Sequence, residues 1–242
     1  MLLQIRPVKK LLAVLVPFLL LFAATAPLEA APADREYIVL VGGPSLMQWE
    51  KYKAQPHDNW WANFVRAGRI RTEQLRERYG PEAKITWLVY KQGYIDRGEQ
   101  EKRDLIPFIE SVRDAFKLNL VWFRSGDEVI NYINNGQPRD QVKVAFLEFF
   151  GHSNKACFMF DYSSNVDSAS KSFLHQSQLT QISRRAFTKD SLVRSWGCHT
   201  GEMMSQKWYQ AVGNRMWGAI GKTQYMTNEL PIISTPGGRW TN

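Results

Sequence analysis

The feature that most constrains the fold of this chain is a regular alternation between short apolar runs and segments of helical periodicity. Residues 37–41 (YIVLV) are continuously apolar and end in Gly42-Gly43-Pro44, a pattern typical of a strand that is buried on both faces. From Asn59 to Tyr79 the apolar residues recur at helical spacing, and Gly80-Pro81 ends the segment. Such alternation favours a largely parallel sheet with helices on both faces.

The rest of the chain continues this pattern. Further strands are expected at 84–90, 119–124, 142–150, 156–162 (a short strand or hairpin arm), 191–197 and 216–220. Further helices are expected around 105–116, 125–133, 179–182 and 202–212. The helix at 125–133 has the clearest start, because Ser125-Gly126-Asp127-Glu128 fits a capping box. We therefore predict an α/β fold, a three-layer sandwich with a mostly parallel central sheet and helices on both faces.

The N-terminal residues follow the order of a secretory signal. Basic residues precede an apolar run from Leu11 to Ala24, and small residues follow it. The run contains Pro17 and is shorter than the roughly 20 residues of a membrane-spanning helix, although an uncleaved anchor is the alternative interpretation. We predict that residues 1–33 are a signal peptide and that residues 34–242 form one exported domain, secreted or periplasmic.

Three cleavage sites are compatible with the small residues that follow the apolar run. Ala31-Pro32-Ala33 fits the A-x-A pattern and would make Asp34 the first mature residue. Ala24-Thr25-Ala26 would leave Pro27 in that position, and Leu28-Glu29-Ala30 carries a bulky residue at its start. We therefore expect cleavage before Asp34, or before Ala31 if the last of these sites is used.

The charges are scattered along the chain. The formal net charge is +8 at pH 7, but basic residues alternate with acidic ones, as in Arg69–Arg78 and Arg97–Arg103. This alternation predicts a solvated surface in these segments and no nucleic-acid partner. Once the signal is removed we expect no stable membrane insertion, since no later segment is apolar enough to span a bilayer. The pattern implies no particular oligomeric state.

Two cysteines, Cys157 and Cys198, are present. In an exported protein two cysteines are by default one disulfide. Cys198 has a second interpretation, because it stands where a predicted strand ends and a predicted helix begins, and a helix N-terminus favours the thiolate. His152 follows another predicted strand. If these strands are neighbours in a parallel sheet, both side chains project over the same edge, where a Cys–His pair has the parts for acyl transfer.

At these positions the chain resembles caspase-like cysteine peptidases, and metacaspases in particular. That family places a His after an aromatic-rich strand as Y-S-G-H-G and a Cys after the next strand as D-S-C-H-S-G. The matching segments here are residues 149–153 (FFGHS) and 196–201 (WGCHTG). The resemblance extends over the strand–helix succession from Tyr37 to Tyr225 and implies a caspase-like fold, a peptide or protein substrate, and no cofactor or metal.

The resemblance also implies roles for single residues. His152 would be the general base, Cys198 the nucleophile, and the backbone N–H groups of Ser153 and Cys198 the oxyanion donors. Trp196 replaces the Asp with which metacaspases recognise a basic P1 side chain, so basic specificity does not carry over. Asp161 offers an acidic pocket or, more simply, caps a turn. We therefore regard Asp161 and Trp196 as the candidate substrate-binding residues.

This chain departs from the family in two further ways. Ser153 stands where the family has Gly, and residues 119–133 form an extra strand–helix unit before the His strand. A zinc site made of His152, Cys157, Cys198 and His199 is disfavoured, because successive strand residues point to opposite faces. If Cys198 is the nucleophile, the two cysteines stay unbridged in the active protein.

Two other functions remain open. Gly151-His152-Ser153 after a strand partly fits the G-x-S-x-G elbow of a serine hydrolase, with Ser153 as the nucleophile, but Lys155 occupies the last Gly position. A catalytically degenerate domain that binds peptides is the other alternative. Ser153 and Trp196 favour that interpretation, and Trp60, Trp61 and Trp208 would be available to line its groove.

Overall fold

The computed structural model describes residues 32–47, 50, 58–162 and 171–241. Its centre is a six-stranded sheet in which every neighbouring pair is parallel. The strands are β1 (Arg35–Val41), β2 (Lys84–Tyr90), β3 (Asn119–Phe123), β4 (Lys143–Phe150), β8 (Phe187–Ser195) and β9 (Met216–Trp217). The largely parallel sheet predicted from the alternation is therefore confirmed. Of the predicted signal, residues 1–31 lie outside the described residues.

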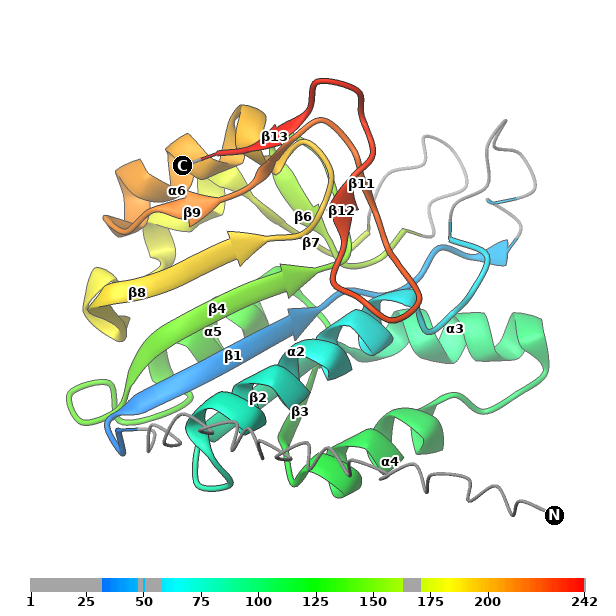
Figure 1. Ribbon diagram of the computed structural model, residues 1–242, viewed down its shortest axis with the longest axis horizontal. Helices are drawn as coiled ribbons and strands as arrows, with labels where there is room; N and C mark the ends of the chain where they lie inside the picture. The colour runs from blue at the N-terminus through cyan, green and yellow to red at the C-terminus, as the bar shows by residue number, and fades with distance from the viewer. Residues whose placement is uncertain (1–31, 48–49, 51–57, 163–170, 242) are drawn as a thin grey trace, which may run out of the picture.

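The strand order, β3-β2-β1-β4-β8-β9, places β1 and β4 at the centre of the sheet. The chain adds β2 and β3 on one side of β1 and then β4, β8 and β9 on the other. The arrows of β1, β4 and β8 run side by side in one direction (Figure 1). In open sheets of this kind, the crevice beyond the carboxyl ends of the strands, where the order reverses, is the usual place of a ligand site.

Helices cover both faces of the sheet. They are α2 (Asn63–Tyr79), α3 (Lys91–Glu101), α4 (Ile106–Phe116), α5 (Gly126–Asn135) and α6 (Met204–Val212), with the 3₁₀ turns η1 (Gln176–Gln181), η2 (Arg184–Ala186) and η3 (Thr200–Glu202). α2 lies in front of the sheet and α5 behind it (Figure 1). The buried clusters place α4 on the side of α2, and α6 and η1 on the side of α5. The predicted three-layer arrangement is confirmed.

The strand β1 shows why its sequence is apolar at every position. Ile38 and Leu40 belong to the core under α5 and α6, whereas Tyr37, Val39 and Val41 belong to the core under α2 and α4. All five side chains are 3 % exposed or less. Because successive strand residues point to opposite faces, a strand between two helical layers must be apolar on both.

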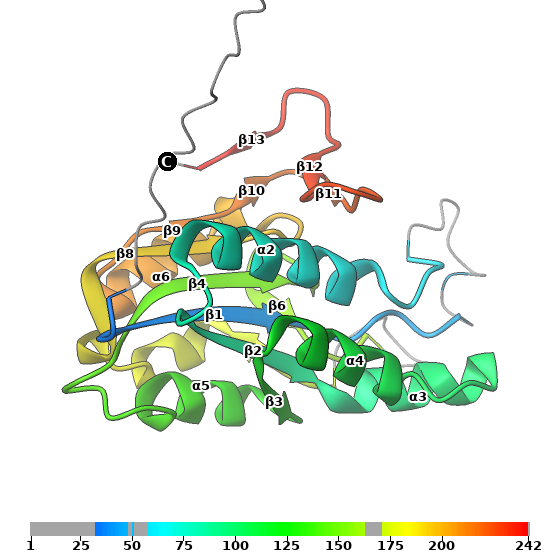
Figure 2. The same ribbon diagram turned by 60° about the horizontal axis from the view of Figure 1, so that its bottom comes forward.

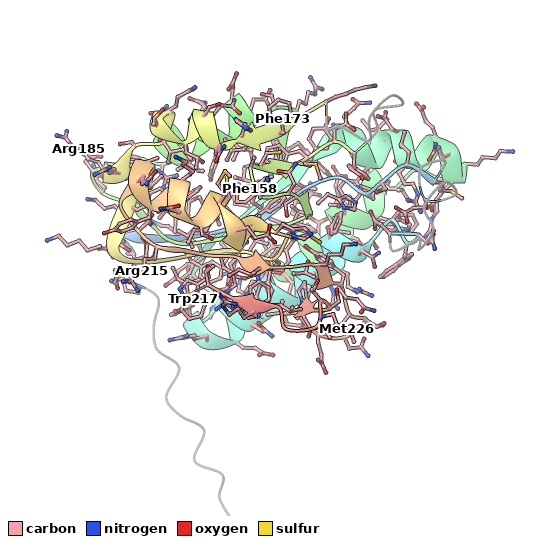
Figure 3. The ribbon with its side chains drawn as sticks, turned by 90° about the horizontal axis from the view of Figure 1, so that it is seen from above. Phe158, Phe173, Arg185, Arg215, Trp217 and Met226 are labelled. Atoms are coloured by element: carbon pink, nitrogen blue, oxygen red, sulfur yellow. The ribbon has the colours of Figure 1, made fainter. Side chains whose placement is uncertain are left out.

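A small antiparallel sheet follows β4 and replaces the longer strand expected at 156–162. It consists of β5 (His152–Ser153), β6 (Cys157–Met159) and β7 (Phe173–His175). Phe158 on β6 is buried in the core with α5 and α6, whereas Phe173 on β7 is exposed near the edge of the molecule (Figure 3). The hairpin arm predicted after His152 is therefore confirmed, in shorter form.

The segment after α6 forms two short antiparallel pairs. They are β10 (Ala219–Ile220) with β13 (Arg239–Trp240), and β11 (Thr223–Gln224) with β12 (Ile232–Ile233). The expected strand 216–220 is thus divided between β9 and β10. This segment lies on the same side of the sheet as α2 (Figure 2). Within the described part of the chain, none of the helices has the length and apolar character needed to cross a bilayer.

The solvated surface predicted for Arg97–Arg103 is wrong at its first residue. Arg97 lies on α3, a helix that the sequence did not predict because its residues, KQGYIDRGEQE, carry few apolar side chains. Its guanidinium is fully buried and donates to the carbonyl groups of Ser45, Asp58 and Asn59. Trp208, considered above for a groove, is fully buried on α6.

Candidate active site

The two residues proposed for catalysis follow neighbouring strands at the same level. β4 and β8 pair in parallel, with Phe149 opposite Ser195, and Trp196 N–H donates to Phe149 O at 2.9 Å. His152 and Cys198 each stand three residues beyond this pair. The sheet therefore brings both residues to its carboxyl edge.

The loops that carry these residues are in direct contact. The Ser153 hydroxyl donates to the Cys198 carbonyl at 2.7 Å, which ties the residue after the histidine to the cysteine. A Cβ atom added at Gly197 would lie 2.0 Å from Ser153 Oγ, so only Gly leaves room for this contact. Ser153 thus serves the packing of the two loops, although the sequence offered it as a competing nucleophile.

The ring of His152 has hydrogen-bonding and aromatic neighbours. Its Nε2 atom lies 2.9 Å from Asp58 Oδ2 and 2.9 Å from Ser45 Oγ. Phe64 meets the ring edge-on at 4.9 Å between centroids, and Tyr162 stacks on it at 4.6 Å. The side chain is 10 % exposed. These contacts fix the ring in one orientation and leave a small part of it accessible.

Cys198 lies in the turn between β8 and η3, and its sulfur contacts Thr223. The Thr223 N–H donates to Sγ at 3.4 Å, and the Thr223 hydroxyl lies 3.6 Å from it. The helix expected over 202–212 is present as α6, preceded by the 3₁₀ turn η3, so a few residues separate Cys198 from the helix N-terminus. His199 adopts a left-handed conformation with φ 61°, and α6 begins only at Met204. The polar surroundings of the sulfur therefore come from β11.

The two backbone groups suggested as oxyanion donors belong to the same pair of loops. Asn154 N–H donates to Cys157 O at 3.1 Å, which makes this a hydrogen-bonded pair of the β5–β6 ladder. Ser153 and Phe158 are then the neighbouring non-hydrogen-bonded pair, in which N–H groups point away from the partner strand. The Ser153 N–H thus points away from β6.

Tyr225, which the sequence did not single out, also contacts residues of the site. The Tyr225 hydroxyl accepts the N–H of Gly151 at 2.8 Å, and its ring packs edge-on against Phe64 at 4.7 Å. Burial raises the pKa of Tyr225 well above its usual value, so the hydroxyl stays neutral. It positions the backbone just before His152.

The two candidate substrate-binding residues lie in the interior. Trp196 is 5 % exposed; its indole stacks on Phe150 and donates to Glu148 Oε2 at 2.6 Å. Asp161 is also 5 % exposed, and its charge contributes, after burial itself, to a raised pKa of Tyr90. Trp196 thus packs as a core residue, and Asp161 is a buried group beside the end of β2.

Glu148 is a buried carboxylate within the apolar strand β4, and the sequence pattern did not indicate its role. It is 1 % exposed, and Arg71 Nε donates to it at 2.8 Å opposite the indole of Trp196. Burial raises the pKa of Glu148, while the charge of Arg71 opposes this shift. This network fastens α2 to β4 and to the residue that follows β8.

The cysteine and histidine residues that the structure describes show no metal geometry. Both cysteines are free thiols, and His199 Nδ1 lies 2.6 Å from Glu202 Oε1. Among the described residues, no group of three or more His, Cys, Asp or Glu side chains is placed to hold a metal ion.

Cys198 should react with iodoacetamide much faster than Cys157. Burial raises the pKa of Cys157, which lowers its thiolate fraction at neutral pH. Cys198 instead stands at the sheet edge with a backbone N–H directed at its sulfur. Mass spectrometry of peptides after brief labelling would measure both rates. Equal rates, or a quantitative Cys157–Cys198 bridge whose reduction unlocks no reactivity, would contradict the assignment of Cys198 as the nucleophile.

No family model matches the chain, and searches of curated proteins and of solved structures give no match either.

Proposed function

We propose that this protein is an exported cysteine endopeptidase of caspase-like type. Cys198 is the nucleophile and His152 the general base for acyl transfer on a peptide bond. The observation that carries the proposal is the placement of these two residues at the same level beyond the paired strands β4 and β8. Ordinary packing does not require a histidine and a cysteine at adjacent strand ends.

The chemistry follows from the residue types. His152 accepts the proton of the Cys198 thiol, and the thiolate attacks the carbonyl carbon of the scissile bond. The oxyanion that forms is stabilised by the backbone N–H groups of Ser153 and Cys198. The imidazolium then returns the proton to the leaving amine, and water hydrolyses the thioester with His152 again as base. Each step balances without a metal or cofactor.

The hydrogen bonds of the site also support a second candidate. The Cys198 sulfur is hydrogen-bonded to Thr223, and the Nε2 atom of His152 is hydrogen-bonded to Asp58 and Ser45. Catalytic hydrogen bonds are often formed only in the substrate complex, so this arrangement is compatible with an enzyme. It equally suits a domain that binds peptides without cleaving them.

The serine-hydrolase alternative has less support. Ser153 is only 7 % exposed, and its hydroxyl donates a hydrogen bond to the Cys198 carbonyl. A nucleophile elbow leads from a strand into a helix, whereas Ser153 is followed by β6.

The Ser153→Ala variant distinguishes the cysteine mechanism from a serine hydrolase. We expect peptide cleavage to survive in it, because the cysteine mechanism uses only the backbone N–H at that position. Stability should fall by about 1 kcal/mol for the lost hydrogen bond. His152→Ala should slow cleavage by about a hundred- to ten-thousandfold, the usual contribution of a general base. Turnover of a peptide library by the purified domain, followed by mass spectrometry, provides the measurement.

Two other results would change the assignment. If Ser153→Ala is inactive while Cys198→Ala cleaves normally, the protein is a serine hydrolase. If the native domain binds peptides but cleaves neither peptides nor esters, it is a binding domain.

A further inference from the structure

A buried carboxylate, Asp58, faces the candidate base from the residues just before α2. Asp58 is 2 % exposed, and its Oδ2 atom lies 2.9 Å from His152 Nε2. The same oxygen accepts the N–H of Ser45 at 2.8 Å, and Oδ1 accepts the side-chain amide of Asn63 at 3.0 Å. The protein therefore surrounds this carboxylate with donors and directs one of its oxygens at the imidazole.

The geometry determines which nitrogen of His152 carries the proton. A carboxylate can only accept hydrogen bonds, so Nε2 at 2.9 Å must be the donor. The Ser45 hydroxyl, also 2.9 Å from Nε2, then accepts from the same N–H. In the neutral ring the lone pair is consequently on Nδ1, and Nδ1 is the atom that can take a proton.

A fully buried arginine holds the backbone on both sides of this carboxylate. Arg97 on α3 donates to the backbone carbonyls of Ser45, Asp58 and Asn59. Its Nε also pairs with Glu101 at 2.7 Å. The orientation of Asp58 is thus set by contacts that do not involve His152. A group that is fixed independently in this way can determine the orientation of the imidazole.

We propose that Asp58 is the positioning residue of the candidate active site. It holds His152 in the Nε2–H tautomer, so that the Cys198 thiol proton passes to Nδ1, and it stabilises the imidazolium that results. The proton on Nε2 stays there and does not move to Asp58. The role in turnover rests on the proposed function, whereas the tautomer of His152 is a property of the unliganded protein.

The test compares Asp58→Asn with a matched control, Glu50→Gln. Glu50 is also 2 % exposed and contacts the same residue, because its carboxylate accepts the N–H of Asp58 at 3.1 Å. Each substitution preserves the shape of the side chain and removes one charge. The first changes a group that contacts the His152 ring, whereas the second changes a group that contacts the Asp58 backbone.

We expect Asp58→Asn to lower kcat on the order of 10²- to 10⁴-fold with little change in KM. Nitrogen-15 NMR of the His152 ring should show Nε2–H in the native protein and in Glu50→Gln. In Asp58→Asn it should show a mixture of both tautomers, because the amide can either accept or donate. Glu50→Gln should keep kcat near the native value.

Three results would overturn the proposal. The first is a native His152 protonated on Nδ1 when neutral, which needs no variant and so decides the matter even if Asp58→Asn does not fold. The second is Asp58→Asn with native kcat and an unchanged tautomer. The third is an equal loss in both variants with native ring spectra, which would indicate a merely structural loop. If the native protein cleaves nothing but its tautomer shifts as expected, the positioning role stands and the proposed function alone fails.

Discussion

The Cys198→Ala variant is expected to lose peptide cleavage and covalent labelling by active-site reagents, with kcat lowered by on the order of 10⁴-fold or more. The sulfur is the atom that forms the acyl intermediate, and Ala offers no nucleophile in its place. The fold should remain, because Cys198 is partly exposed and its hydrogen bonds are weak contacts with Thr223. The free energy of unfolding should change by about 1 kcal/mol or less.

Cys157→Ala is the matched control for this experiment. It removes the other thiol of the chain from β6, where the sulfur lies 3.4 Å from Asn154 Oδ1. We expect it to keep native cleavage and labelling. Steady-state kinetics on a cleavable peptide, together with intact mass after labelling, would compare the variants. Native turnover in Cys198→Ala would eliminate the cysteine mechanism.

The largest effect on stability is expected from Arg97→Met. Removing the guanidinium leaves the carbonyls of Ser45, Asp58 and Asn59 without their buried donor, and Glu101 without its partner. The free energy of unfolding should fall by roughly 3 kcal/mol, as it does when one partner of a buried polar network is removed. Urea denaturation followed by circular dichroism would measure it.

Arg103→Met provides the comparison from the same basic segment. Arg103 is exposed, and its guanidinium lies 3.9 Å from the centre of the Phe108 ring. We expect a change of about 1 kcal/mol or less, since such a contact at the surface contributes little. Equal destabilisation by both substitutions would show that the buried contacts of Arg97 do not stabilise the loop.

The strands were predictable because each depends on the apolar pattern of its own few residues. Residues 84–90 were expected as a strand and form β2 over those residues, six of the seven being buried. The helix α3 was missed, because only Gly93, Tyr94, Arg97 and Gly98 are buried along it, and two glycines with one arginine do not make an apolar stripe. Where burial is achieved by polar contacts, hydrophobic periodicity carries no signal.

The candidate dyad was predictable for a topological reason. Parallel strands end at one edge, so residues that follow neighbouring strands meet there once the order is known. The partners of His152 were not predictable in this way. Asp58 precedes a helix and has the pattern of an ordinary loop or capping residue, and Ser45 follows a glycine-rich turn.

The sequence by itself determined the α/β class, the parallel sheet and the edge at which His152 and Cys198 stand, because these depend on patterns that span one strand or helix at a time. Only the tertiary structure decided what each of the two side chains contacts. Asp58 and Ser45 are 94 and 107 residues from His152, and Thr223 is 25 residues from Cys198. Hydrogen bonds over such separations depend on how loops from different strands pack together, which no local pattern in the chain records.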